Sequence, residues 1–168
     1  MHIGHVNILV RDAAASRDWY SQLLGLHTYH FVPGTAAFLS ADIESSHELA
    51  LMQVGPDAPL QQRNQVGLHH FAFMVDTLDD LKTIYRRIKD NDVPIAHISD
   101  HGLSLGIYIR DPDGNGVEVS YELPRDQWPR ETQVFAADVT NLGRFPGPWD
   151  SDPAFTARRK LTEAMPIV

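Results

Sequence analysis

The chain has 168 residues, of which 43% are hydrophobic and 21% charged, as is usual for a globular protein. It contains no cysteine, which excludes disulfides, cysteine nucleophiles and iron–sulfur clusters, so any metal must be held by His, Asp, Glu or backbone oxygen. Acidic residues outnumber basic ones by 22 to 14, and the net charge of −8 argues against nucleic-acid partners and anionic membranes. Because no apolar run reaches the roughly 20 residues of a membrane span and the N-terminal segment lacks a signal-peptide pattern, we expect a cytoplasmic protein.

Two stretches of the sequence repeat one another without gaps. They are HVNILVRDAAASRDWYSQLL, residues 5–24, and HFAFMVDTLDDLKTIYRRIK, residues 70–89. Each predicts a strand followed by a helix, because a short β-prone run precedes apolar residues spaced at i, i+3 and i+4. Thr77 with Asp80 predicts the start of the second helix, and Gly25 predicts the end of the first.

Three strand-like runs follow each predicted helix. They cover residues 26–33, 35–42 and 47–54 in the first copy, and 94–99, 103–111 and 115–122 in the second. The repeated unit is therefore βαβββ, and the predicted fold class is α+β. Since one helix covers only one face of a four-stranded sheet, we expect the two modules to form a curled, pseudo-twofold sheet around a shared cavity.

We expect one domain over residues 1–168. It divides into a first module at 1–54, a linker rich in Pro, Gly and Gln at 55–67, a second module at 68–122 and a proline-rich tail at 123–168. Within the tail, Asp152 is expected to cap a short helix from Pro153 to Met165.

Side chains alternate between the two faces of a strand, so each predicted strand can be divided into two sets of residues. One set is large and apolar, as expected beneath a helix. The other combines small residues with polar ones and suits the wall of a cavity. This second set includes His5, His70, Tyr108 and Glu118, and the repeat places His5 and His70 at equivalent positions.

Two imidazoles and one carboxylate from separate strands can form a facial triad, which leaves open positions on an octahedral metal. We therefore expect His5, His70 and Glu118 to line a metal-binding cavity. This set suits Fe(II) best, with Mn(II), Ni(II) and Zn(II) as alternatives. A single His on a strand is more often an ordinary hydrogen-bonded residue, and that interpretation is kept for His2, His27, His30 and His97.

The segments HVNILVRD, GLHHFAFMVDTLDDL and DPDGNGVEV resemble the three metal-ligand segments of the vicinal oxygen chelate superfamily (glyoxalase, bleomycin resistance, extradiol dioxygenase). The resemblance covers about residues 3–122. Within the superfamily, the chain is most similar to one-domain type I extradiol (catechol 2,3-) dioxygenases. Their signature is matched by His101, Ile107, Tyr108, Asp111, Pro112, Gly114 and Glu118, with Ser99 as the one departure.

The resemblance implies cleavage of a catechol-type aromatic diol by O2 at a metal held by His5, His70 and Glu118. It also implies that His101 and Tyr108 hydrogen-bond the substrate or an intermediate and that the protein is a homodimer.

Two features depart from the dioxygenase pattern. The acid–base His of the two-domain enzymes would fall at Pro56, and alternation places the substitutes His47 and His69 on the apolar faces. In addition, the repeat places Glu48 like Glu118, at the position that supplies a fourth ligand or base in glyoxalase I. The alternatives are thus a metal-dependent isomerase, epimerase or lyase of this superfamily, or a non-catalytic small-molecule binding (resistance) protein.

Overall fold

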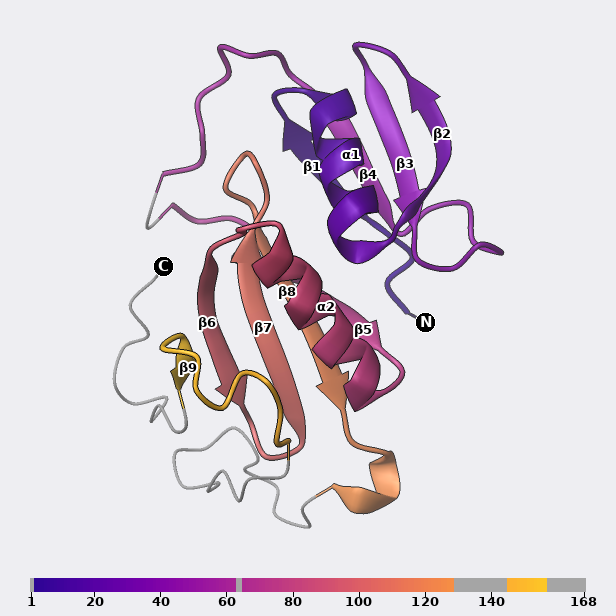
Figure 1. The fold of residues 1–168 in the computed structure, drawn as a ribbon. Helices are drawn as coiled ribbons and strands as arrows, with labels where there is room; N and C mark the ends of the chain where they lie inside the picture. Colours follow the sequence, from indigo (N-terminus) through magenta and orange to yellow (C-terminus); the bar gives the residue numbers. More distant parts are fainter. Residues whose placement is uncertain (1, 63–64, 129–144, 157–168) are drawn as a thin grey trace. The chain divides into compact units, whose positions relative to one another are not determined.

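The computed structural model describes residues 2–62, 65–128 and 145–156. The chain forms two compact units, Met1–Gln61 with Asp111–Asn115 and Gln62–Arg110 with Gly116–Val168. Each unit contains one βαβββ module, in which a single helix covers one face of a sheet (Figure 1). The α+β class and the repeated module predicted from the sequence are therefore confirmed.

The first unit contains β1 (Val6–Val10), α1 (Ala13–Leu24), β2 (His27–Val32), β3 (Ala36–Ser40) and β4 (Leu49–Gln53). Its strands follow the order β1-β4-β3-β2, with β1 parallel to β4 and the other pairs antiparallel. The Asp12 side chain caps the start of α1, and Gly25 ends it in the left-handed conformation, with φ of 78°.

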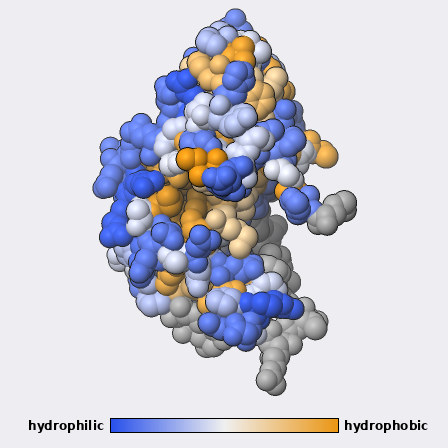
Figure 2. Space-filling view, turned by 90° about the vertical axis from the view of Figure 1, so that its right-hand side faces the viewer, coloured by the Kyte–Doolittle hydropathy of each residue, from blue (hydrophilic) through white to orange (hydrophobic). Residues whose placement is uncertain are grey.

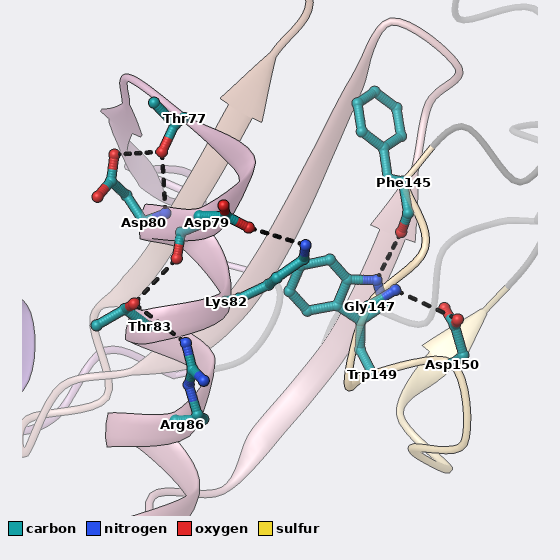
Figure 3. A network of polar contacts seen from close by, with 10 residues as sticks. All are labelled: Thr77, Asp79, Asp80, Lys82, Thr83, Arg86, Phe145, Gly147, Trp149 and Asp150. Atoms are coloured by element: carbon teal, nitrogen blue, oxygen red, sulfur yellow. Dashed lines mark hydrogen bonds and ion pairs between the residues drawn. The ribbon is translucent and has the colours of Figure 1, made fainter.

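The second unit contains β5 (Phe71–Val75), α2 (Leu78–Asp90), β6 (Ile95–Asp100), β7 (Ser104–Arg110) and β8 (Gly116–Glu122). They are followed by the 3-10 turn η1 (Arg125–Gln127) and the short strand β9 (Phe155–Thr156). The sheet order is β5-β8-β7-β6-β9. Thr77 caps α2 as predicted, its hydroxyl oxygen accepting from the Asp80 backbone N–H at 3.1 Å (Figure 3).

The burial of β1 follows the predicted alternation of faces. Ile8 and Val10 are buried, whereas Leu9 on the opposite face is 63% exposed. Met74, which the repeat aligns with Leu9, is also 63% exposed. Figure 2 shows hydrophobic residues at the protein surface, interspersed with hydrophilic ones. Of the helices that the structure describes, none is long and apolar enough to cross a bilayer.

The DPDGNG turn is held by one buried carboxylate. Oδ1 of Asp111 accepts from the backbone N–H groups of Asp113 and Asn115, and Oδ2 accepts from the Tyr20 hydroxyl and the Asn115 amide. Burial raises the pKa of Asp111, and these donors act in the opposite direction. Tyr20 is fully buried, so this turn belongs to the core of the first unit.

Replacing Asp111 with Asn is expected to lower the free energy of unfolding by about 2–4 kcal/mol, because the new NH2 group cannot accept from the donors facing Oδ1 or Oδ2. Urea unfolding followed by circular dichroism measures the loss. Asp113→Asn is the control, since its Oδ2 accepts the Arg11 backbone N–H and an amide oxygen can do the same. Equal losses in the two variants would contradict this account.

The tail differs from the prediction where the structure describes it. Residues 153–156 form a turn and β9, not the start of a helix, and the rest of the predicted Pro153–Met165 helix lies outside the described residues. The physical reason is the open edge of β6. The backbone N–H of Ile98 donates to the Ala154 carbonyl at 2.8 Å, and β9 pairs in parallel with β6.

Candidate functional site

A row of paired residues crosses the second sheet on the face opposite α2. Glu118 on β8 lies between Ala72 on β5 and Tyr108 on β7, and Tyr108 in turn lies opposite His97 on β6. His70 precedes Ala72 by two positions and lies just before β5 begins. The alternation inferred from the sequence thus brings His70, Tyr108 and Glu118 together.

His70 and Glu118 form the closest pair of candidate ligands. Nε2 of His70 lies 3.1 Å from Oε2 of Glu118, and the Glu118 side chain is only 12% exposed. Two ligand atoms at right angles on an ion, with bonds of about 2.1 Å, would be about 3.0 Å apart, so this pair fits one edge of an octahedral site.

His69 contributes to the orientation of His70. The Nδ1 atoms of the two rings lie 2.6 Å apart, which is a hydrogen-bond distance. With the proton on Nδ1 of His70, its Nε2 lone pair is free for a metal. The prediction that His69 lies on the apolar face is wrong, because this residue precedes β5 and strand alternation does not extend to it.

Two strand glycines on the predicted cavity face, Gly106 and Gly116, make room for this pair, a role that was not predicted for them from the sequence. A Cβ at Gly106 would overlap Oε1 of Glu118 and approach Tyr108 Cε2 at 3.0 Å. A Cβ at Gly116 would overlap the backbone carbonyl of His69 and approach His70 Cβ at 2.9 Å. Glycine within a strand pattern is the sequence signal for such close approaches.

If His70 and Glu118 bind a metal as the sequence predicts, Gly106→Ala is expected to lower the metal affinity by about ten- to a hundredfold while leaving the fold intact. The carboxylate it displaces is the end of a flexible side chain, so Glu118 can turn away from His70 without a shift of the backbone. Metal analysis after dialysis measures the first effect and thermal unfolding the second. Gly4→Ala is the control, because a Cβ there meets nothing within 4 Å. Undiminished metal binding by Gly106→Ala would refute the prediction.

Tyr108 and His101 supply neutral polar groups beside Glu118. Nε2 of His101 lies 3.4 Å from the Tyr108 hydroxyl oxygen. Burial raises the pKa of Tyr108 far above its usual value, and the charge of Glu118 and a hydrogen bond to it add to the effect. Burial lowers the pKa of His101, partly offset by the carboxylates of Glu118 and Asp100. At neutral pH the phenol therefore keeps its proton and the imidazole is uncharged.

His5 lies in the first unit, just before β1, and is exposed. Its ring contacts that of His47, with centroids 4.6 Å apart, and the His47 ring also contacts Phe38 at 5.4 Å. The prediction that His47 lies on the apolar face is wrong, because it precedes the start of β4 and its ring lies on the side of His5. Within the described ranges, no group of three or more His, Asp or Glu side chains is placed to hold a metal, so the complete triad stays a prediction.

Glu48 is engaged elsewhere in the first unit. Its Oε2 accepts from the Ser40 hydroxyl at 2.9 Å and from the Ala41 N–H at 2.8 Å. The strand register also changes the alignment of the two repeats. Glu118 lies between Ala72 and Tyr108 on the neighbouring strands. In the first unit, the residue in the equivalent place, between Asn7 and Phe38, is Ala50. The longer connection between β3 and β4 accounts for the shift. Ala50, not Glu48, matches Glu118.

Several known proteins are similar to this chain. It is 30% identical over 133 residues to a catechol-2,3-dioxygenase of Bacillus subtilis, covering 79% of this chain and 45% of that protein. It is 34% identical over 120 residues to biphenyl-2,3-diol 1,2-dioxygenase 2 of Rhodococcus globerulus, covering 70% and 61% respectively. The chain thus spans about half to three-fifths of the length of these curated relatives.

Solved structures share the same fold. A lactoylglutathione lyase from Agrobacterium tumefaciens matches with a TM-score of 0.56 at 26% identity, covering 71% of this chain and 92% of that one. A glyoxalase/dioxygenase from Nostoc punctiforme matches with a TM-score of 0.60 at 26% identity, covering 73% and 92%. The sequence profile of one superfamily matches residues 2–119. The chain therefore belongs to the Glyoxalase/Bleomycin resistance protein/Dioxygenase superfamily.

Proposed function

We propose that this chain carries an extradiol ring-cleavage dioxygenase site, which acts on a catechol-type aromatic diol with O2. The metal would be Fe(II), held by His5, His70 and Glu118, with Mn(II), Ni(II) or Zn(II) as alternatives. The supporting observation is that Tyr108 and His101 lie beside the His70–Glu118 pair in one unit. The names of the two curated relatives support the same reaction.

Each residue has a distinct task in this proposal. His70 and Glu118 supply two adjacent ligands at one point of the second sheet. Bound there, Fe(II) would lower the pKa of a coordinated diol and bring the diol and O2 together. The neutral His101 imidazole has one lone pair and one N–H, so it can take a proton from the diol or donate a hydrogen bond. Tyr108 keeps its hydroxyl proton, so it serves as a hydrogen-bond donor to the substrate.

The test is oxygen uptake by the full chain after anaerobic reconstitution with Fe(II). Catechol and 2,3-dihydroxybiphenyl serve as probes, and we expect O2 consumption in step with the absorbance of a ring-opened product. An absence of uptake with a broad panel of diols, at full metal occupancy, would overturn the proposal. Substrate binding without turnover would instead favour a small-molecule binding protein.

A metal-dependent isomerase or lyase is the second candidate, favoured by the structural likeness to a protein described as a lactoylglutathione lyase. A four-ligand version of this site would require Glu48, whose carboxylate already bonds to Ser40 and Ala41. Glu48→Gln should therefore retain metal, as should the exposed control Glu44→Gln. Loss of metal in Glu48→Gln alone, with O2-independent activity of the parent protein, would favour the isomerase.

A further inference from the structure

His97 and Tyr108 form a parallel ring stack on the open face of the second sheet. Their ring centroids are 4.0 Å apart and their planes differ by 9°. Both side chains are partly buried, and the two residues are direct partners in the β6–β7 register. Because Tyr108 also pairs with Glu118 across β7 and β8, the imidazole of His97 extends the row that contains the candidate ligand.

A β-bulge places His97 in this row. Ile95 lies opposite Ile109, but the next partner of β7, Tyr108, lies opposite His97, so Ala96 is the extra residue. Without the bulge, Ala96 would lie opposite Tyr108 and His97 would be on the other face of the sheet. Bulges that turn one side chain in this way are common beside functional sites.

The first unit contains a related arrangement. A register shift between Thr28 and His30 places His30 opposite Phe38, with ring centroids 6.2 Å apart and planes differing by 28°. This first pair has no hydroxyl and a wider separation. In the second unit the aromatic ring is the phenol of Tyr108. The register shift there therefore places a histidine ring against a residue whose hydroxyl can form hydrogen bonds.

Tyr108 also contacts the ring of His70, with centroids 5.4 Å apart and planes nearly perpendicular at 88°. The phenol ring is thus constrained by His97 through stacking and by His70 through an edge contact, while its hydroxyl lies near His101. We propose that His97 is a positioning residue, which stacks on Tyr108 and keeps its hydroxyl directed towards the diol site. This inference rests on the dioxygenase activity proposed above.

The kinetic test compares His97→Phe, His97→Leu and His97→Ala in the Fe(II)-reconstituted full chain with 2,3-dihydroxybiphenyl. Phe retains a flat ring, so we expect kcat within about threefold of the parent, whereas Leu and Ala should lower kcat by about tenfold with unchanged iron content. A kcat that is retained with Phe but lowered with Leu would show that ring stacking, and not only the volume of the side chain, positions Tyr108. Equal kcat in the Phe and Leu variants would overturn the proposal.

A second measurement does not depend on turnover. The five tyrosines are labelled with 3-fluorotyrosine, and the Tyr108 resonance in the 19F NMR spectrum is assigned from its loss in Tyr108→Phe. We expect His97→Ala to displace this resonance and the matched change His30→Ala to leave it in place. An unmoved resonance in His97→Ala would refute the stacking role, even if the dioxygenase activity is confirmed. A displaced resonance without O2 uptake would confirm the stacking and contradict the proposed function instead.

Discussion

Under the proposed function, Glu118→Ala is expected to lose bound metal and all measurable ring cleavage. Changes to residues that only support metal ligands cost about ten- to a hundredfold in affinity, so loss of a charged ligand should cost at least a hundredfold. Metal content after dialysis and O2 uptake measure the two effects. Glu122→Ala on the same strand is the matched control, because it removes the same type of side chain at the end of β8.

The stability of the metal-free protein distinguishes a ligand from a structural residue. The Glu118 side chain is 12% exposed, and burying a carboxylate carries a desolvation cost. His70 with its proton on Nδ1 does not offset this cost, because its Nε2 lone pair faces Oε2 of Glu118. Metal-free Glu118→Ala should therefore be at least as stable to urea as the metal-free parent. A large loss of stability, together with normal metal content, would mean that Glu118 is a structural residue.

The sequence predicted the fold well because its signals are local and repeated. Alternation identified the faces of β1, β5, β7 and β8, and the caps at Gly25 and Thr77 define helix ends that the structure confirms. These features depend on neighbouring residues in the chain, which a single sequence contains.

The details of the site were harder to predict because they depend on register and on strand ends. Equal spacing in the two modules aligned Glu48 with Glu118, but the longer β3–β4 connection moves Ala50 into that position. His47 and His69 lie before their strands begin, so alternation assigned them to the wrong side. The bulge at Ala96 has no clear sequence signal, and without it His97 would be expected on the opposite face.

The second large effect is expected in the tail, where Trp149→Ala should lower the free energy of unfolding by about 3–5 kcal/mol. Trp149 is fully buried, and its indole N–H donates to the Phe145 carbonyl at 2.9 Å (Figure 3). Its ring contacts that of Tyr85 on α2. A Cβ at Gly147 would overlap the same ring, so the chain passes close around it. This packing makes the described tail part of the hydrophobic core of the second unit.

Urea unfolding followed by far-ultraviolet circular dichroism measures this loss without relying on tryptophan fluorescence. Trp128→Ala is the matched control, because that indole also donates to a backbone carbonyl, of Leu123 at 2.7 Å, but is only partly buried. Trp128→Ala should lower the free energy of unfolding clearly less than Trp149→Ala does, since it removes less buried apolar surface. Metal content should be unchanged in both variants, because in the described part of the chain the recorded contacts of these rings are with Tyr85, Phe145 and Leu123 and not with His70 or Glu118. If Trp149→Ala lowered the free energy of unfolding no more than Trp128→Ala, the described tail would not be part of the hydrophobic core of the second unit.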